Sequence, residues 1–447
     1  MLSDPSSGLS PTLQDFFSGV QGVATNPTSI PSRQTALSSA ETLAGRFNSL
    51  GSRLDEIAQG VNSQVLSSVS NINTYAQQLS QLNDAISRAQ RATGQPPNDL
   101  LDQRDQLVLD LNKEIKATVV KQGDGDYNVF IGNGQPLVVG VNTFTLTNVT
   151  SPTNPQKIEV AYQNRDGSKV IVGESGFVGG KLGGLIEFRN KTLEPAQNAL
   201  GRVAIGLAST FNAQHRAGYD LSGVAGGDFF VAASPVVTSH TGNTGTAAIS
   251  ASISNAGALT TSDYRLQYDG SNYTLTRLSD NTTTTFASFP QTVDGVDLNL
   301  ASGTAMAGDS FLIRPTAGGA SGFAVAITDP ASIAAAAATG APGDNRNALL
   351  LGALQSANTL GNGTTTYQGA YSQFVSQVGN KTRELEVTSS AAGKLLSEAT
   401  LSLQNESGVN LDEEATNLLR YQQAYQAAGK VMQIASQMFD VLLTLGQ

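Results

Sequence analysis

The chain of 447 residues is long enough for about two to four domains, and its formal net charge of −10 argues against nucleic acid or an anionic membrane as the main partner. Only 14% of the residues are charged, against about a quarter in an average domain, and weakly charged surfaces are cheaper to desolvate between subunits. Cysteine is absent, which excludes disulfides, and no apolar run reaches the roughly 18–20 residues of a membrane span. The N-terminus also lacks the pattern of a secretory signal.

The first 118 residues predict the first part of a helical bundle. A short helix is expected over about 12–23, and a very long one over about 33–91, where apolar residues recur every three or four positions. The Gly-Gln-Pro-Pro run at 94–97 ends it, and Asn98 is expected to cap a second helix that runs to about 117. Together the two long segments predict an αα-hairpin.

Residues 119–189 predict a small β-rich subdomain, because the apolar period changes from about 3.6 to 2 at Val119. A hairpin is expected across 119–131, with a Gly/Asp turn. The Gly-rich run at 179–185 is expected to lead into a bundle helix within 190–215, at about 192–213. His215 lies near the end of that helix, where we expect it to complement the helix dipole.

The remaining chain divides into three parts. Residues 216–340 are poor in helical patterns and predict an inserted all-β domain. The alanine run at 334–338 is expected to begin a linker that reaches residue 347, and residues 341–406 contain a helix from about 367 to 404 that closes the bundle. Residues 407–447 predict a C-terminal axial helix of coiled-coil type. The expected fold class is therefore α+β multidomain.

The C-terminal helix, expected over 410–445 with Asn410 as its cap, carries a seven-residue apolar repeat. Such a stripe is equally compatible with packing onto the chain's own domain. Its position, the glycine break at 408 and the length of the repeat favour a separate partner. The candidate partner-binding residues are Leu411, Leu418, Tyr421, Tyr425, Met432, Met438, Phe439 and Leu442.

The amino-acid sequence of the C-terminal region resembles a known signature. The segments SGVNLDEE at 407–414, LLRYQQAY at 418–425 and MFD at 438–440 resemble the C-terminus of flagellar axial proteins. Within them, the chain is most similar to the hook–filament junction family, that of flagellar hook-associated protein 1 (FlgK). The run GGKLGGL at 179–185, the segment GDSFLI at 308–313 and residues 9–33 resemble internal parts of the same family.

The resemblance implies a non-enzymatic subunit of the bacterial flagellum that joins hook to filament through helical-lattice contacts. It implies export by the flagellar type III apparatus to the extracellular flagellum. The implied partners are other copies of the chain, the hook protein, the second junction protein and a cytosolic export chaperone on the helix at 410–445. Family members begin with a longer helical segment that pairs with this helix, so we expect its apolar stripe to be exposed here.

Residue constellations that would support chemistry fail on their spacing. The chain has only two histidines and no zinc-peptidase motif. A phosphate loop at Gly179-Gly180-Lys181 fails because Ser175 and Leu182 occupy positions that require Gly and Ser or Thr. A calcium loop beginning at Asp124 fails because Val129 and Gln135 occupy the Gly and Glu positions. We therefore expect no catalytic, cofactor-binding or metal site.

A second hypothesis is an adhesin-like surface-binding module that recognises a glycan or host protein through residues 216–340. An exposed aromatic cluster around Tyr264, Tyr268 and Tyr273 would favour it.

Overall fold

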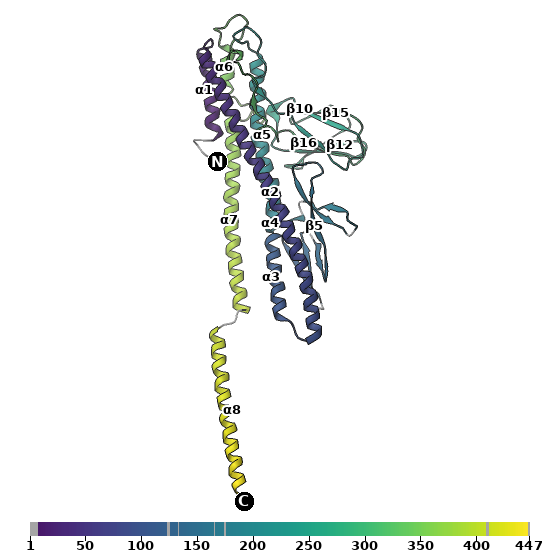
Figure 1. The fold of residues 1–447 in the computed structure, drawn as a ribbon. Coiled ribbons are helices and arrows are strands. Elements are labelled where there is room, and N and C mark those ends of the chain that lie inside the picture. The colour runs from purple at the N-terminus through teal and green to yellow at the C-terminus, as the bar shows by residue number, and fades with distance from the viewer. Residues whose placement is uncertain are drawn as a thin grey trace. The chain divides into compact units, whose positions relative to one another are not determined.

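The computed structural model describes residues 8–122, 126–132, 134–164, 166–173, 176–407 and 411–445. It contains two compact units, Met1–Val378 and Gly379–Gln447. The finer division expected at residues 118, 189, 215, 340 and 406 stays a prediction. The helices, labelled in Figure 1, are α1 Leu9–Thr25, α2 Ile30–Thr93, α3 Asn98–Glu114, α4 Gly180–Phe188, α5 Glu194–Arg216, α6 Arg346–Ala353, α7 Tyr367–Ser407 and α8 Leu411–Leu445.

The long helix α2 is the spine of the first unit, and it extends the predicted helix by a few residues at each end. The Ser29 hydroxyl caps its N-terminus by accepting a bond from the Ser32 amide at 3.3 Å. Gly94, at φ 67°, ends it in the left-handed conformation that glycine adopts without strain. The predicted αα-hairpin of α2 and α3 is confirmed, but Asn98 is the first helical residue rather than a cap. Pro97 occupies the cap position without a side-chain bond.

The first β-rich part follows α3 and consists of two small antiparallel sheets, with strand orders β1-β2-β3-β4 and β5-β6-β7. The predicted hairpin is confirmed, since Val119 pairs with Val129, while its turn at 123–125 lies outside the described residues. The strands are β1 Ala117–Lys121, β2 Tyr127–Ile131, β3 Gln135–Val139, β4 Asn142–Thr143, β5 Thr145–Thr150, β6 Ile158–Gln163 and β7 Lys169–Ile171.

Asparagines of α2 hold these strands against the helix. Asn73 donates to the Leu146 carbonyl at 2.8 Å and accepts from the Leu146 amide at 3.0 Å. Asn83 makes the same pair of bonds with Tyr127, at 2.9 and 3.2 Å. Asn62 bonds the Gln156 carbonyl and the Ile158 amide. The three asparagines are spaced by 11 and 10 residues, about three helical turns, so they share one face of α2 and satisfy backbone groups that the sheets leave open.

The glycine-rich run at 179–185 is a helix, not a lead-in to one. Residues Gly180–Phe188 form α4, and a π-helical turn, η2 Arg189–Leu193, connects α4 to α5. A Cβ on Gly180 would lie 2.5 Å from the Ile115 nitrogen, so glycine lets the start of α4 approach the end of α3. Tertiary packing has overridden the weak helix propensity of this run.

A β-rich region, called the inserted β-domain below, lies between α5 and α6 and agrees with the predicted fold class, while its expected bounds of 216–340 stay a prediction. Its main sheet has five antiparallel strands in the order β13-β12-β11-β16-β9, beside a three-stranded sheet β10-β15-β14 and a two-stranded one, β17-β8. The turn η3 Ala256–Ala258 lies between β10 and β11, and the turn η4 Pro330–Ser332 follows β17. The strands are β8 Phe230–Val231, β9 Val236–Ser239, β10 Ala248–Ile253, β11 Tyr264–Tyr268, β12 Tyr273–Arg277, β13 Thr283–Phe286, β14 Gln291–Val293, β15 Val296–Ser302, β16 Ser310–Arg314 and β17 Ala324–Val325.

The expected alanine linker belongs to the core instead. Ala334, Ala335 and Ala336 are buried, and the short helix α6 begins at Arg346, inside the predicted linker. Alanine side chains are small and apolar, so this run can lie against the Arg33 region of α2. The buried Arg33 guanidinium donates to the Ile333 carbonyl at 2.6 Å and to the Pro27 carbonyl at 2.6 Å.

His215 is buried in the last turn of α5 and does not act as the predicted cation. Its Nε2 accepts a bond from the Ala334 amide at 2.9 Å, which requires that Nδ1 carry the proton and donate to the Gly227 carbonyl at 2.8 Å. Burial lowers the pKa of His215 below its usual value, so the imidazole is neutral.

Replacing His215 with glutamine tests this assignment. A histidine whose pKa is depressed by folding contributes stability above its unfolded pKa of about 6.5 and loses it as the pH falls, at up to about 1.4 kcal/mol per pH unit. The wild type should therefore lose more unfolding free energy than His215→Gln between pH 7.5 and 5.5. Denaturant titrations of both proteins measure this, and other titrating groups cancel in the difference. Parallel pH curves would show that the imidazole is not held neutral.

Candidate subunit-binding surface

One apolar face of α7 is buried near the start of the helix and exposed to solvent further along. Tyr371 and Phe374 are 4% and 3% exposed and belong to the core of the first unit. The same heptad positions continue with Leu385 and Leu395, which are 48% and 66% exposed. The first turns of α7 belong to the core of the first unit, and the bundle-closing role of residues 341–406 stays a prediction.

Sequence reasoning did not identify the solvent-exposed part of α7, from Leu385 to Leu401 and called its bare part below, as a candidate surface. The signal was present, since the apolar spacing of seven residues runs unbroken from Tyr371 through Val378 to Leu385. What the spacing could not show is where the chain's own core ends. The exposed large apolar residues of this part are Leu385, Val387, Leu395, Leu396 and Leu401.

Helix α8 confirms the predicted C-terminal helix, and its apolar stripe is exposed within this chain. Leu418 is 62% exposed and Tyr425 is 84% exposed, with Tyr421, Met432 and Met438 in the same state. Their role as partner-binding residues stays a prediction. The Asn410 cap and the side chains of Leu411, Phe439 and Leu442 lie outside the described residues.

The composition of α8 makes this stripe inexpensive to bury. Between Tyr421 and Met438 the sequence has a single charged residue, Lys430, among alanines and glutamines. Burying each large apolar side chain gains about 1.5–3 kcal/mol, and little desolvation of charge opposes it. The exposed apolar face of α8 could therefore be buried against another surface with little desolvation of charge.

The aromatic cluster that would favour an adhesin-like module is not exposed. Tyr264 and Tyr273 are buried, and the Tyr273 ring lies 4.7 Å from that of Phe289 inside the β-domain core. The surface-binding hypothesis is not supported. Among the described residues there is no cluster of three or more metal-ligating His, Asp or Glu side chains, and none of the described helices is long and apolar enough to cross a membrane.

The arrangement defines a class of protein: a structural subunit with a long-helix body, inserted β-domains and uncovered helices. Family models identify it further. The helical domain of flagellar hook-associated protein FlgK matches residues 1–230, and the D2-like domain of flagellar hook-associated protein 1 matches residues 238–315. The C-terminal model of the flagellar basal body rod FlgEFG proteins matches residues 403–445.

Individual relatives agree. Flagellar hook-associated protein 1 of Escherichia coli K12 is 38% identical over 450 residues, which cover all of this chain and 82% of that protein. The Salmonella typhimurium protein of the same name is 39% identical over 458 residues, with the same coverage. The solved hook junction protein FlgK of Burkholderia pseudomallei has a TM-score of 0.85 at 31% identity, covering 90% of this chain and 95% of that one. This chain belongs to the FlgK family and is a structural protein of the bacterial flagellum.

The two parts of the α7 stripe should respond differently to truncation. Phe374→Ala removes a buried ring and should lower the free energy of unfolding by about 3–5 kcal/mol. Leu395→Ala removes an exposed side chain and should change it by less than about 0.5 kcal/mol. Denaturant titration of the full chain, followed by circular dichroism, provides the comparison. Equal losses would show that the chain covers the whole stripe itself.

Proposed function

We propose that this chain joins the hook to the filament as a subunit of a helical lattice. The supporting observation is the apolar stripe on α7 and α8, which the described part of the chain leaves exposed. In a helical lattice each subunit presents the same unfilled surface to its neighbours, so contacts repeat without closing. The partners are other copies of the chain, the hook protein and the second junction protein.

The bare part of α7 adds to the surface that neighbours would cover. Leu395 and Leu396 are exposed by 66% and 67%, similar to Leu418 on α8. Helices of adjacent subunits would pack along both stripes in coiled-coil fashion, with knobs at the heptad positions. The acidic chain has few charges to desolvate in such contacts.

Export through the flagellar type III apparatus, to an extracellular location, is the second part of the proposal. An exposed apolar helix is an aggregation hazard before assembly, so a cytosolic export chaperone on α8 would shield it. The proposed role is mechanical and non-enzymatic.

Charges placed on the stripe should prevent joining without unfolding the body. Leu418→Asp combined with Met432→Asp should abolish motility and release filament protein into the medium, because buried carboxylates would oppose helix packing. The test is complementation of a strain that lacks this gene, with filaments counted by electron microscopy.

The matched control places the same charges on the opposite face of α8, as Gln423→Asp with Gln437→Asp. Both glutamines are exposed and lie at heptad positions away from the stripe. This control should swim normally. If the stripe variant also swims normally, the lattice role of α8 is wrong.

The same variants test whether the export chaperone binds the stripe on α8, independently of the lattice contacts. Calorimetric titration of the full chain with the cognate flagellar export chaperone should give tight binding for the wild type and for the Gln423→Asp, Gln437→Asp control. Binding should weaken at least tenfold for the stripe variant, since the chaperone would cover the same residues. Unchanged affinity of the stripe variant would place the chaperone elsewhere.

A further inference from the structure

Strands β9 to β16 of the inserted β-domain contact α5 through a few side chains, and this contact is called the seam. Strand β8 lies outside the seam, because Asn212 of α5 bonds it and Phe230 packs in the core of the first unit. Asn198 of α5 donates from Nδ2 to the Asp263 carboxylate at 2.9 Å. The Thr316 hydroxyl, where the chain leaves the β-domain, donates to Oδ1 of the same asparagine at 3.2 Å. One amide on α5 therefore bonds two points of the domain, Asp263 just before β11 and Thr316 just after β16. Ile205, also on α5, is the apolar part of this seam and lies in the β-domain's core.

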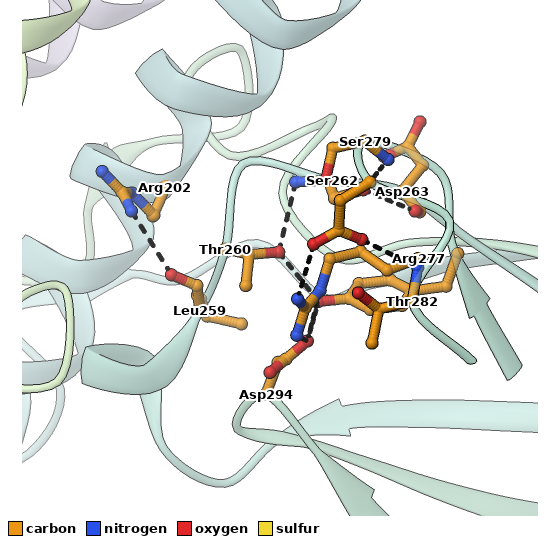
Figure 2. Close-up of polar contacts among 11 residues, drawn as sticks. Arg202, Leu259, Thr260, Ser262, Asp263, Arg277, Ser279, Thr282 and Asp294 are labelled. Atoms are coloured by element: carbon orange, nitrogen blue, oxygen red, sulfur yellow. Dashed lines mark hydrogen bonds and ion pairs between the residues drawn. The ribbon is translucent and has the colours of Figure 1, made fainter. Parts of the chain in front are cut away.

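Two arginines at the seam are incompletely satisfied. Arg314 lies opposite Asp263 across the β11–β16 pair, because the register joins Tyr264 to Ile313. Its buried Nε has no hydrogen-bond partner among the described residues. The same holds for Nε of Arg202 on α5, whose Nη1 reaches the Leu259 carbonyl at only 3.5 Å (Figure 2). Buried donors without partners indicate that this closed arrangement is not optimal for either arginine.

The β-domain side of the seam is itself firmly held. Asp294 accepts from the Tyr264 hydroxyl at 2.6 Å and from Arg277 Nε at 3.0 Å, and Figure 2 shows this cluster next to Asp263. The Ser262 hydroxyl donates to the Asp263 carbonyl and accepts from the Ser279 amide. Any rearrangement would therefore separate the domain from α5 rather than distort the domain.

Asp263 and Arg314 also line a cleft of about 680 Å³ between the β-domain, α2 and the first β-rich part. The charged groups that face Asp263 are Arg314 from β16, Glu194 from α5 and Lys157 from before β6. Lys157 is paired with Glu194 at 3.2 Å. Three other charged residues border the seam or the cleft: Arg202, Asp55 and Arg189.

We propose that the seam between the inserted β-domain and α5 is a joint with a closed and an open arrangement, and that the charge on Asp263 sets their balance. In the closed arrangement the carboxyl group is desolvated and bonded to Asn198. In the open one it is hydrated, and the arginine donors bind water. The ionised carboxylate favours opening, and the protonated acid favours closure.

The direction follows from proton linkage. Burial, as the largest influence, raises the pKa of Asp263 to about 6, with Glu194 raising it further and Arg314 opposing. A hydrated aspartate has a pKa of about 3.9, so the closed form binds the proton more tightly. The open-to-closed ratio should be about 100-fold higher well above pH 6 than below pH 4, and should fall on the order of tenfold between pH 7.5 and 5.

Amide hydrogen exchange at Asn362 reports opening, because this residue lies between α6 and α7, outside the β-domain, and its N–H donates to the Gly257 carbonyl of the β-domain at 2.8 Å. Asp263→Asn keeps an oxygen for the Asn198 bond and carries no charge. In the full-length chain it should lower the opening ratio at pH 7.5 by about 100-fold and remove its change between pH 7.5 and 5. The Tyr268 amide, bonded inside the β-domain, is the internal reference.

Asp15→Asn removes one exposed carboxylate on α1 and should behave as the wild type. Arg314→Gln removes the cation that opposes proton binding and should move the midpoint of the change to higher pH. The proposal is overturned if Asp263→Asn leaves the exchange of Asn362 unchanged at pH 7.5, or speeds it. It is also overturned if wild-type opening, corrected for intrinsic exchange, is the same at both pH values.

Discussion

The structure depends on one constraint: the apolar face of α7 is longer than the core available to cover it. Tyr371 and Phe374 enter the core of the first unit, while Leu385 and Leu395, on the same heptad positions, do not. Hydrophobic burial is the main favourable term in folding and association, and it does not distinguish between the same chain and a neighbouring one. A single sequence pattern thus first folds the chain and then leaves an apolar surface exposed, which is the surface proposed for assembly.

Low charge serves both purposes. On α8 the stripe has one charged residue, Lys430, between Tyr421 and Met438, and in the body neutral asparagines satisfy several buried backbone groups. Asn73 and Asn83 of α2 each bond both the amide and the carbonyl of one strand residue, and Asn212 of α5 does the same for the strand at Phe230. An amide that donates and accepts at once avoids the desolvation of a charge. The long helix can therefore support irregular β-structure without ion pairs.

The sequence predicted the positions of the long helices and of the first hairpin, which follow from the spacing of apolar residues. It did not predict features that depend on tertiary contacts. The three- and four-residue spacing located α2, α7 and α8 to within a few residues, and the change to a period of two located the first hairpin. Spacing could not show that the glycine-rich α4 is held as a helix against α3, or that His215 accepts a bond from Ala334 and is neutral. The heptad located the apolar stripe on α8, and the family resemblance predicted that it would be exposed. It could not show where α7 leaves the core, because the buried Tyr371 and Phe374 follow the same seven-residue spacing as the exposed Leu385 and Leu395.

The seam at Asp263 and the stripe on α7 and α8 differ in what they lack. The stripe has exposed apolar side chains, and the seam has buried polar groups without hydrogen-bond partners among the described residues. The stripe lacks apolar cover, and only another molecule or segment can supply it in water. Within the described residues, the seam leaves the Nε groups of Arg202 and Arg314 without hydrogen-bond partners, and in the proposed open arrangement water would supply them. An exposed apolar face therefore favours association with another molecule. A seam with unsatisfied hydrogen-bond donors instead permits motion within one subunit. A subunit that combines both can be held firmly along its helices while its β-domain adjusts to its surroundings.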